Sequence, residues 1–158
     1  KTQLINNTMA DILEPIKKDD LIKQYGEYSR EKLIEKLDNG ETRIVLNLPP
    51  VLAPVKVAVL PLLKKDGLPE KAMEIMNDLK FDYKCAYEEK DTIGKRYRRQ
   101  DAIGTPFCVT VDHQTLTDGT VTLRHRDSMQ QDRVKIEDLH GIIGEAVNMR
   151  NLFKKIVD

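Results

Sequence analysis

Residues 55–62 read VKVAVLPL, and this almost unbroken apolar run decides the fold. Continuous runs of this kind are typical of strands that are buried on both faces, as in parallel sheets with helices on each side. Gly67 and Pro69 then begin a segment with the spacing of an amphipathic helix. Its apolar positions are Ala72, Ile75, Met76 and Leu79. A buried strand followed by such a helix predicts the first crossover unit of an α/β fold.

The alternation of strand and helix continues along the chain. The expected elements are a strand at 82–88, a helix at 92–103 and a strand at 107–112. Asp91 or Thr92 is placed to cap the helix, and Gly104 ahead of Pro106 ends it. Because crossover helices join these strands, we expect all three to be parallel.

The last third of the chain predicts antiparallel strands and a final helix. A hairpin loop containing Asp118-Gly119 leads into a strand at 120–126, and a short strand is expected near 133–136. A long C-terminal helix follows, with an apolar stripe formed by Leu139, Ile142, Ile143, Ala146 and Val147. The element order β-α-β-α-β-β-β-α therefore predicts an α/β fold in which helices flank one mixed sheet.

The first 48 residues follow a different pattern. Apolar residues at 9–16 have helical spacing, which Pro15 interrupts. Ser29 caps a second predicted helix, whose apolar residues are Leu33, Ile34 and Leu37. A strand at 43–48 then leads to Pro49-Pro50. We therefore divide the chain into an appendage at residues 1–48 and a main domain at residues 49–158.

The composition of the chain is that of a cytoplasmic globular protein. Its 158 residues are 40% hydrophobic and 33% charged, with a formal net charge of zero. No apolar run approaches the roughly 18 residues that a membrane span needs, and no secretory leader opens the chain. We expect Cys85 and Cys108 to be small buried residues of strands, without metal or thiol chemistry.

One stretch concentrates positive charge. Residues 94–106 read GKRYRRQDAIGTP, with four cations in five positions. On a helical wheel the cations Lys95, Arg96, Arg98 and Arg99 cover an arc of roughly 160°, and Ile93 and Tyr97 lie opposite. Unpaired cations on one helix face are the footprint of phosphate binding. The alternative is a solvated charged face without a ligand.

Carboxylates and arginines from other segments are expected close to this helix. The strand at 82–88 ends at Glu88, and ligands of open α/β sheets gather beyond the carboxyl ends of parallel strands. The stretch TLRHRD, residues 122–127, adds Arg124, Arg126 and Asp127. Mixed arginines and carboxylates suit recognition of base edges, although they also form structural ion pairs. With no phosphate-binding glycine loop and no catalytic arrangement, the residues predict a binding module.

Three stretches closely resemble the C-terminal anticodon-binding domain of glycyl-tRNA synthetases, a domain that class II synthetases for glycine, histidine, threonine and proline share. They are LAPVKVAVLPLLKKDGLPEKAMEIMNDLK, EEKDTIGKRYRRQDAIGTPFCVTVD and DGTVTLRHRDSMQQDRVKIEDL, and the likeness runs from about Thr42 to the end. The resemblance implies a five-stranded mixed sheet with three helices, and no cofactor in this part. It implies a homodimeric parent ligase that uses ATP and Mg²⁺ to join glycine to its tRNA. The catalytic body is missing, so we expect this chain alone not to aminoacylate.

The resemblance also implies which bases the domain reads. Glycine codons are GGN, so the last two anticodon bases are cytosines, which offer an amino donor and two acceptors. As acceptors for the cytosines we expect Glu88, Asp101 and Asp127. As donors we expect Arg96, Arg99, Arg124 and Arg126. Lys95 and Arg98 are expected to hold phosphate, and the acceptors and donors are expected to converge on one open, concave face.

Two other functions stay open on the sequence. A protein-interaction module of the same fold would expose an apolar patch on the C-terminal helix, formed by Leu152, Phe153 and Ile156. A small α/β enzyme would contain a buried cluster of titratable residues around a pocket.

Overall fold

A computed structural model describes residues 34–37, 40 and 42–157, and residues 34–158 cluster as one compact unit. The helical pattern predicted at residues 9–16 lies outside the described residues. The division predicted at residue 48 stays a prediction.

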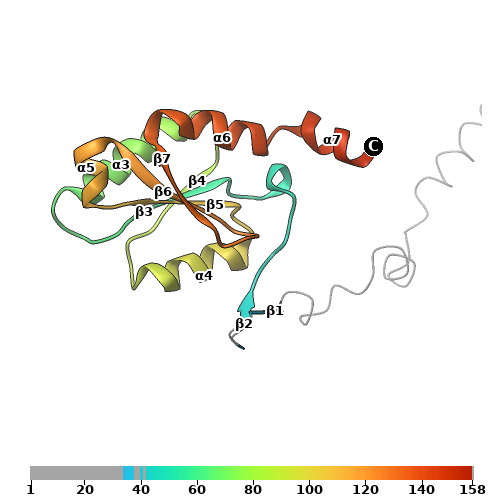
Figure 1. The fold of residues 1–158 in the computed structure, drawn as a ribbon, viewed down its shortest axis with the longest axis horizontal. Coiled ribbons are helices and arrows are strands. Elements are labelled where there is room, and N and C mark those ends of the chain that lie inside the picture. The colour runs from blue at the N-terminus through green and yellow to red at the C-terminus, as the bar shows by residue number, and fades with distance from the viewer. Residues whose placement is uncertain (1–33, 38–39, 41, 158) are drawn as a thin grey trace, which may run out of the picture. The chain divides into compact units, whose positions relative to one another are not determined.

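The unit is built on a five-stranded mixed sheet with the strand order β4-β3-β5-β6-β7 (Figure 1). The central strand β3, Val57–Pro61, is buried along its whole length, as the apolar run predicted. It pairs in parallel with β4, Cys85–Tyr87, and with β5, Phe107–Val111. Antiparallel pairing then adds β6, Thr120–His125, and β7, Gln131–Lys135. The predicted mixed sheet is confirmed.

Helices lie on both faces of this sheet (Figure 1). Helices α3, Leu68–Leu79, and α6, Leu139–Ala146, pack on one face and bury the larger apolar core. Helix α4, Ile93–Ile103, packs on the other face over a small cluster of Ala58, Leu60 and Cys108. No helix of the described residues is long and apolar enough to cross a membrane.

The structure corrects the predicted connection between β5 and β6. Instead of a loop, residues His113–Asp118 form helix α5. Asp112 begins this helix with a capping box, in which its carboxylate accepts from the amide of Thr115 and the hydroxyl of Thr115 accepts from the amide of Asp112. Apolar periodicity gave no signal for so short a helix, but the cap is a sequence signal that could have found it.

The C-terminal helix and the bounds of two strands also differ from the predictions, and β4 begins at Cys85, three residues later than expected. Helix α6 ends at Ala146, and a separate helix α7 spans Met149–Val157. Strand β7 ends one residue earlier than expected, because residues Ile136–Asp138 form the short 3₁₀ helix η3. A second 3₁₀ helix, η2, spans Pro50–Leu52.

The helix predicted around Ile34 and Leu37 is wrong. Residues Ile34–Lys36 form strand β1, which pairs antiparallel with β2, Thr42–Ile44. Gly40, with φ of 81°, therefore lies between the two strands of a hairpin and not at the end of a helix. The predicted strand at 43–48 is shortened to β2.

Burial of the cysteines agrees with their predicted role. Cys108 lies in β5 and is fully buried, which raises the pKa of its thiol to about 12. Cys85 in β4 is half-buried, and burial raises the pKa of its thiol as well. Both thiols are therefore protonated at neutral pH, which makes them poor nucleophiles.

We expect Gly104→Ala to destabilise the protein by about 1–3 kcal/mol. Gly104 ends α4 with φ of 83°, and an added Cβ would lie 3.0 Å from the carbonyl oxygen of Leu46. Gly94→Ala is the matched control, because Gly94 lies within α4 with open space around it and should be neutral or stabilising. Urea unfolding measures both, and equal stability of the two variants would contradict the role of Gly104.

The stability contributed by Asp112 should depend on pH. Arg133 hydrogen-bonds the Asp112 carboxylate and lowers its pKa on folding. A lowered pKa stabilises the fold above the ordinary value of about 3.9 and loses this effect as the pH falls through the folded value. Asp112→Asn should therefore cost about 1–2 kcal/mol at pH 7, and the difference from the parent should shrink below about pH 4. A difference that is constant from pH 7 to pH 3 would contradict this.

Candidate nucleic-acid interface

The register of the sheet separates the predicted residues into two clusters. Glu88 follows β4 and lies at the carboxyl edge, where the parallel strands β3, β4 and β5 end. Strand β6 runs antiparallel, so its last residue His125 pairs with Phe107 at the start of β5. Arg124 and Arg126 therefore lie at the opposite, amino edge of the sheet. The expectation that the acceptors and donors converge on one open face is wrong, because the direction of β6 places its end away from Glu88.

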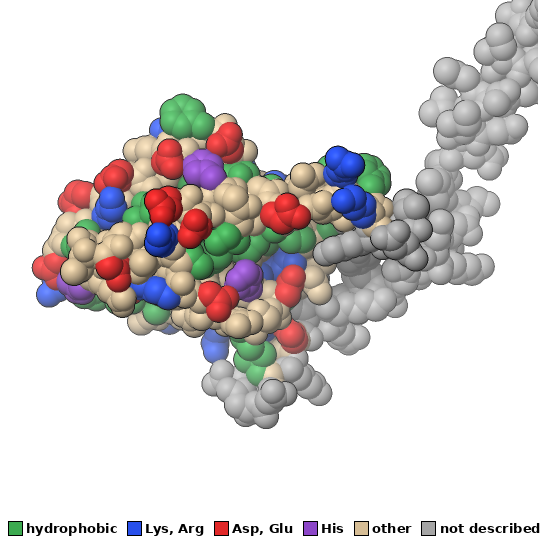
Figure 2. Space-filling view, turned by 45° about the horizontal axis from the view of Figure 1, so that its top comes forward, with side chains coloured by type: hydrophobic (Ala, Val, Ile, Leu, Met, Phe, Trp, Pro, Cys, Tyr) green, Lys and Arg blue, Asp and Glu red, His purple; other side chains and the backbone are tan. Residues whose placement is uncertain are grey.

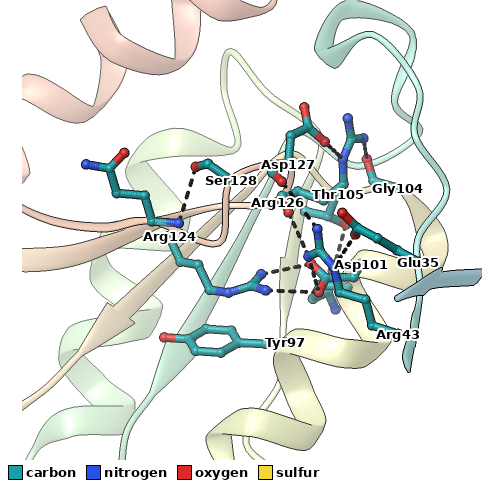
Figure 3. A network of polar contacts seen from close by, with 12 residues as sticks. Glu35, Arg43, Tyr97, Asp101, Gly104, Thr105, Arg124, Arg126, Asp127 and Ser128 are labelled. Carbon is teal, nitrogen blue, oxygen red and sulfur yellow. Dashed lines mark hydrogen bonds and ion pairs between the residues drawn. The ribbon is translucent and has the colours of Figure 1, made fainter. Parts of the chain in front are cut away.

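Asp101 is the centre of the amino-edge cluster (Figure 3). Its side chain, in the last turns of α4, is 1% exposed. Arg124 donates to both carboxylate oxygens, at 2.8 and 3.0 Å, and Arg43 of β2 donates to one of them at 3.2 Å. The guanidinium of Arg124 also lies 4.8 Å from the centre of the Tyr97 ring, within cation–π range. Burial lowers the pKa of Arg124, but the hydrogen bonds and charge of Asp101 outweigh it and leave the pKa raised.

Arg43 extends the cluster to the segment that precedes the sheet. Its Nε donates to Glu35 at 2.5 Å, and its Nη1 donates to the carbonyl of Arg126 at 2.8 Å. Sequence reasoning missed this residue because it lies in the segment interpreted as an appendage. A single arginine beside apolar residues gives no local signal of burial, and its partner Asp101 is 58 positions away.

Arg126 holds the same segment through backbone carbonyls. Its guanidinium donates to the carbonyls of Gly104 at 2.8 Å, Leu48 at 2.7 Å and Leu46 at 3.2 Å, and to the side-chain oxygen of Asn47 at 3.2 Å. Its Nε donates to the neighbouring carboxylate of Asp127 at 2.6 Å. Every one of these contacts is intramolecular.

Three of the predicted base readers are therefore buried, which contradicts their expected place on an open surface. Asp101, Arg124 and Arg126 are buried, and the polar contacts of each are made within the chain. The burial and contacts of these residues fit the alternative interpretation, in which they form structural ion pairs. Asp127 is more exposed than these three, but one of its oxygens holds Arg126.

Arg96 is also buried, which contradicts its predicted place on the outer face of α4. The residue is 2% exposed. Its guanidinium donates to the carbonyls of Pro61 at 2.6 Å, Leu62 at 3.2 Å and Glu88 at 3.2 Å. These carbonyls end β3 and follow β4, so Arg96 occupies the place where open α/β sheets bind small ligands. Burial lowers the pKa of Arg96.

Glu88 and Arg99 form the exposed acceptor–donor pair of the carboxyl edge. The Nη2 of Arg99 lies 2.5 Å from Glu88, and the two side chains are 41% and 23% exposed, respectively. Arg99 also donates to Asp91 at 3.0 Å and to the carbonyl of Lys90 at 2.8 Å. Hydrogen bonding by Glu88 raises the pKa of Arg99. The pair combines a carboxylate and a guanidinium within reach of a ligand.

The outward side of α4 carries Lys95, Arg98 and Arg99, which we call the cationic ridge. Lys95 and Arg98 are exposed, as predicted. Lys90 and Lys64, in the loops that follow β4 and β3, are also exposed at this edge, where Lys64 pairs with Glu89 at 4.0 Å. By contrast, the face that carries α6 mixes acidic and basic side chains (Figure 2). Positive charge is therefore concentrated at α4 although the chain is neutral.

One cavity lies apart from both clusters. A cavity of about 620 Å³ lies between η2 and the helices α6 and α7, and its lining includes Pro50, Val51 and Ala146. Phe153 of α7 is exposed, as a protein-interaction surface would require, while the side chains of Leu152 and Ile156 lie outside the described residues. In the described part of the chain, no group of three or more His, Cys, Asp or Glu side chains is placed to hold a metal ion.

Comparison with known proteins gives a consistent result. A family described as "Anticodon binding domain" matches residues 56–146. A glycine–tRNA ligase of Borrelia hermsii is 55% identical over 109 residues, which cover 69% of this chain and 24% of the ligase. A glycine–tRNA ligase of Treponema denticola is 54% identical over 112 residues, covering 71% and 25%. The chain thus spans about a quarter of the length of the curated relatives it matches.

A solved structure supports the fold. The RNA-binding domain of threonyl-tRNA synthetase from Cryptosporidium parvum superposes with a TM-score of 0.58 at 21% identity. The match covers 63% of this chain and 25% of that one. At this identity the likeness concerns the fold alone.

We expect Asp101→Asn to destabilise the fold by about 3–5 kcal/mol. The variant leaves the buried guanidinium groups of Arg43 and Arg124 without their shared counter-charge. Asp127→Asn is the control, because the Asp127 carboxylate is exposed and its loss should cost less than about 1 kcal/mol. Urea unfolding at pH 7 measures both free energies, and a loss below about 1 kcal/mol for Asp101→Asn would contradict the structural role.

Proposed function

The chain belongs to the family of anticodon-binding domains, and we propose on this basis that it binds the anticodon loop of a tRNA. The cationic ridge supports the proposal, because positive charge on one exposed helix face attracts a phosphate backbone. The burial of Arg96 supports it too, since a filled crevice at the carboxyl edge argues against a small-molecule ligand there.

The identity of the tRNA follows from the relatives. We propose that the chain acts as a part of a homodimeric glycine–tRNA ligase, a cytoplasmic enzyme that uses ATP and Mg²⁺ to join glycine to its tRNA. The relatives named glycine–tRNA ligase are about four times as long as the matched region. Catalysis in this proposal belongs to the other three quarters of the enzyme, and this chain supplies recognition.

Lys95 and Arg98 of the cationic ridge are suited to contact phosphate groups. Lys95 makes no ion pair with any described residue, so its ammonium group can neutralise a phosphate without giving up a protein contact. Arg98 lies three residues further along the same exposed side of α4. Contacts of this kind fix the position of the RNA but carry no sequence information.

The proposal of base recognition rests on the Glu88–Arg99 pair. A cytosine presents an amino group that donates to a carboxylate, next to two acceptors that a guanidinium satisfies. Glu88 and Arg99 place these two groups 2.5 Å apart at the exposed edge. A cytosine that binds there exchanges the ion pair for two complementary hydrogen bonds in the same place. Of the predicted acceptors, Glu88 is the one with its carboxylate beside the ridge.

Specificity should depend on Glu88. We expect the chain to bind the anticodon stem-loop of a glycine tRNA more tightly than a stem-loop in which the second and third anticodon bases are changed. Glu88→Gln should reduce this ratio of affinities by about 5- to 150-fold, since a base-reading pair contributes about 1–3 kcal/mol of discrimination. Titration at physiological salt measures the ratio, and equal affinity of the parent chain for both RNAs would contradict base recognition.

Lys95 should act on all RNAs alike. We expect Lys95→Gln to weaken binding of both stem-loops by the same factor and to reduce the slope of log K against log salt by about one unit, because one phosphate contact is lost. Lys80→Gln, on the last turn of α3 at the other face of the sheet, is the control and should change neither. An unchanged salt slope for Lys95→Gln would remove the ridge from the interface.

A further inference from the structure

One part of the sheet lies outside the small apolar cluster beneath α4, which contains no residue of β6 or β7. Arg124 at the end of β6 contacts Asp101 of α4, Thr120 at its start contacts Asp118 of α5, and polar side chains of the two strands form the surface between them. We call this surface the open sheet face. It consists of Thr120, Thr122, Gln131, Arg133 and Lys135.

The open sheet face is polar by strand alternation. Val121 and Leu123 of β6 are buried in the core with α3 and α6, and Val134 of β7 packs against them. Side chains alternate along a strand, so the five residues of the open sheet face point away from this core. All five carry hydrogen-bonding groups. A polar sheet face of this kind is able to contact a polar ligand directly.

The open sheet face is continuous with α4. The hydroxyl groups of Tyr97 on α4 and Thr110 on β5 are 2.6 Å apart. In the register of the sheet Thr110 pairs with Thr122, and Thr122 pairs with Arg133. Neighbouring strands are about 4.8 Å apart, so Arg133 lies on the order of 10 Å from Thr110. The open sheet face and α4 are therefore neighbours on the same side of the sheet.

Arg133 has an unusual state of hydrogen bonding. Its Nε donates to the hydroxyl of Thr120 at 2.6 Å. Its Nη1 donates to Asp112 at 2.6 Å and to the hydroxyl of Thr122 at 3.2 Å. Its Nη2 donates to Asp112 at 3.0 Å and to the carbonyl of Thr120 at 3.0 Å. All five N–H groups of the guanidinium are therefore used within the protein.

Because all five N–H groups of Arg133 are already bonded, only the two planar faces of its guanidinium can contact a ligand. The side chain of Arg133 is 27% exposed, and its contacts with Asp112, Thr120 and Thr122 fix the plane. Because the Asp112 carboxylate neutralises the charge of the Arg133 guanidinium, Arg133 attracts phosphate only weakly. Planar guanidinium groups stack on nucleobases, and this stacking does not require free N–H donors.

We infer that the open sheet face holds an unpaired nucleobase of the RNA loop, stacked on the guanidinium of Arg133. This inference rests on the proposed function, because the cationic ridge is what brings the loop to the surface. It adds a contact that is tolerant of sequence, since every base has a planar face. Arg133 therefore contributes to affinity, and Glu88 with Arg99 contributes to the choice of base.

Arg133→Lys tests the stacking. Lysine keeps the positive charge and can pair with Asp112, but it has no planar group. In titrations with the glycine anticodon stem-loop, we expect affinity to fall about tenfold with an unchanged salt slope, because no phosphate contact is lost. Stem-loops with 2-aminopurine at successive loop positions should show one position whose fluorescence responds to the parent chain and not to the variant. Equal affinity and fluorescence for both proteins would overturn the inference.

A second pair of variants covers the case in which Arg133→Lys unfolds. Gln131→Glu adds a negative charge to the open sheet face at an exposed residue, and Asn77→Asp adds the same charge on α3 behind the sheet. We expect Gln131→Glu to weaken binding several-fold and Asn77→Asp to leave it unchanged. Equal effects of the two overturn the inference while the proposed function stands. A parent chain that binds neither stem-loop overturns the proposed function itself.

Discussion

The rest of this structure depends on one buried carboxylate. Asp101 sits near the end of α4 and accepts hydrogen bonds from Arg124 of the sheet and from Arg43 of the preceding segment. A buried carboxylate without partners would be costly, and so would two buried guanidinium groups without a counter-charge. Asp101 and Arg124 therefore require each other, and Arg43 is shared between Asp101 and Glu35. Together they fasten helix, sheet and preceding segment to one another at the amino edge.

This arrangement decides which charged groups are available to a ligand. Three buried guanidinium groups donate to groups of the same chain, namely those of Arg43, Arg124 and Arg126. Arg96 fills the crevice at the carboxyl edge. The cationic ridge of α4 stays exposed. It includes Arg99 of the Glu88–Arg99 pair, and the open sheet face lies on the same side of the sheet as α4. In the proposed complex a helix fixed at its C-terminal end presents its cations in one orientation, and this preorganisation lowers the entropic cost of binding RNA.

The sequence was informative where local pattern decides structure. The run VKVAVLPL predicted β3, helical spacing predicted α3, and Gly104 marked the end of α4. It was uninformative where distant residues decide burial. A helical wheel treats Arg96 and Arg98 alike, because nothing local shows that the carbonyls of Pro61 and Leu62 lie beside Arg96. The sequence predicts Asp101 as a base reader, because nothing near it in the chain shows that Arg43, 58 positions earlier, donates to it.

The most direct test of the account is an NMR titration of the ¹⁵N-labelled chain with the anticodon stem-loop of a glycine tRNA. Backbone amides and arginine Nε–H groups report the exposed and the buried clusters separately in one experiment. The account predicts chemical-shift changes at Glu88, along the cationic ridge and at β7, with the Nε–H signals of Arg43 and Arg124 unchanged. Changes centred on Arg43 and Arg124, with the ridge unaffected, would contradict it.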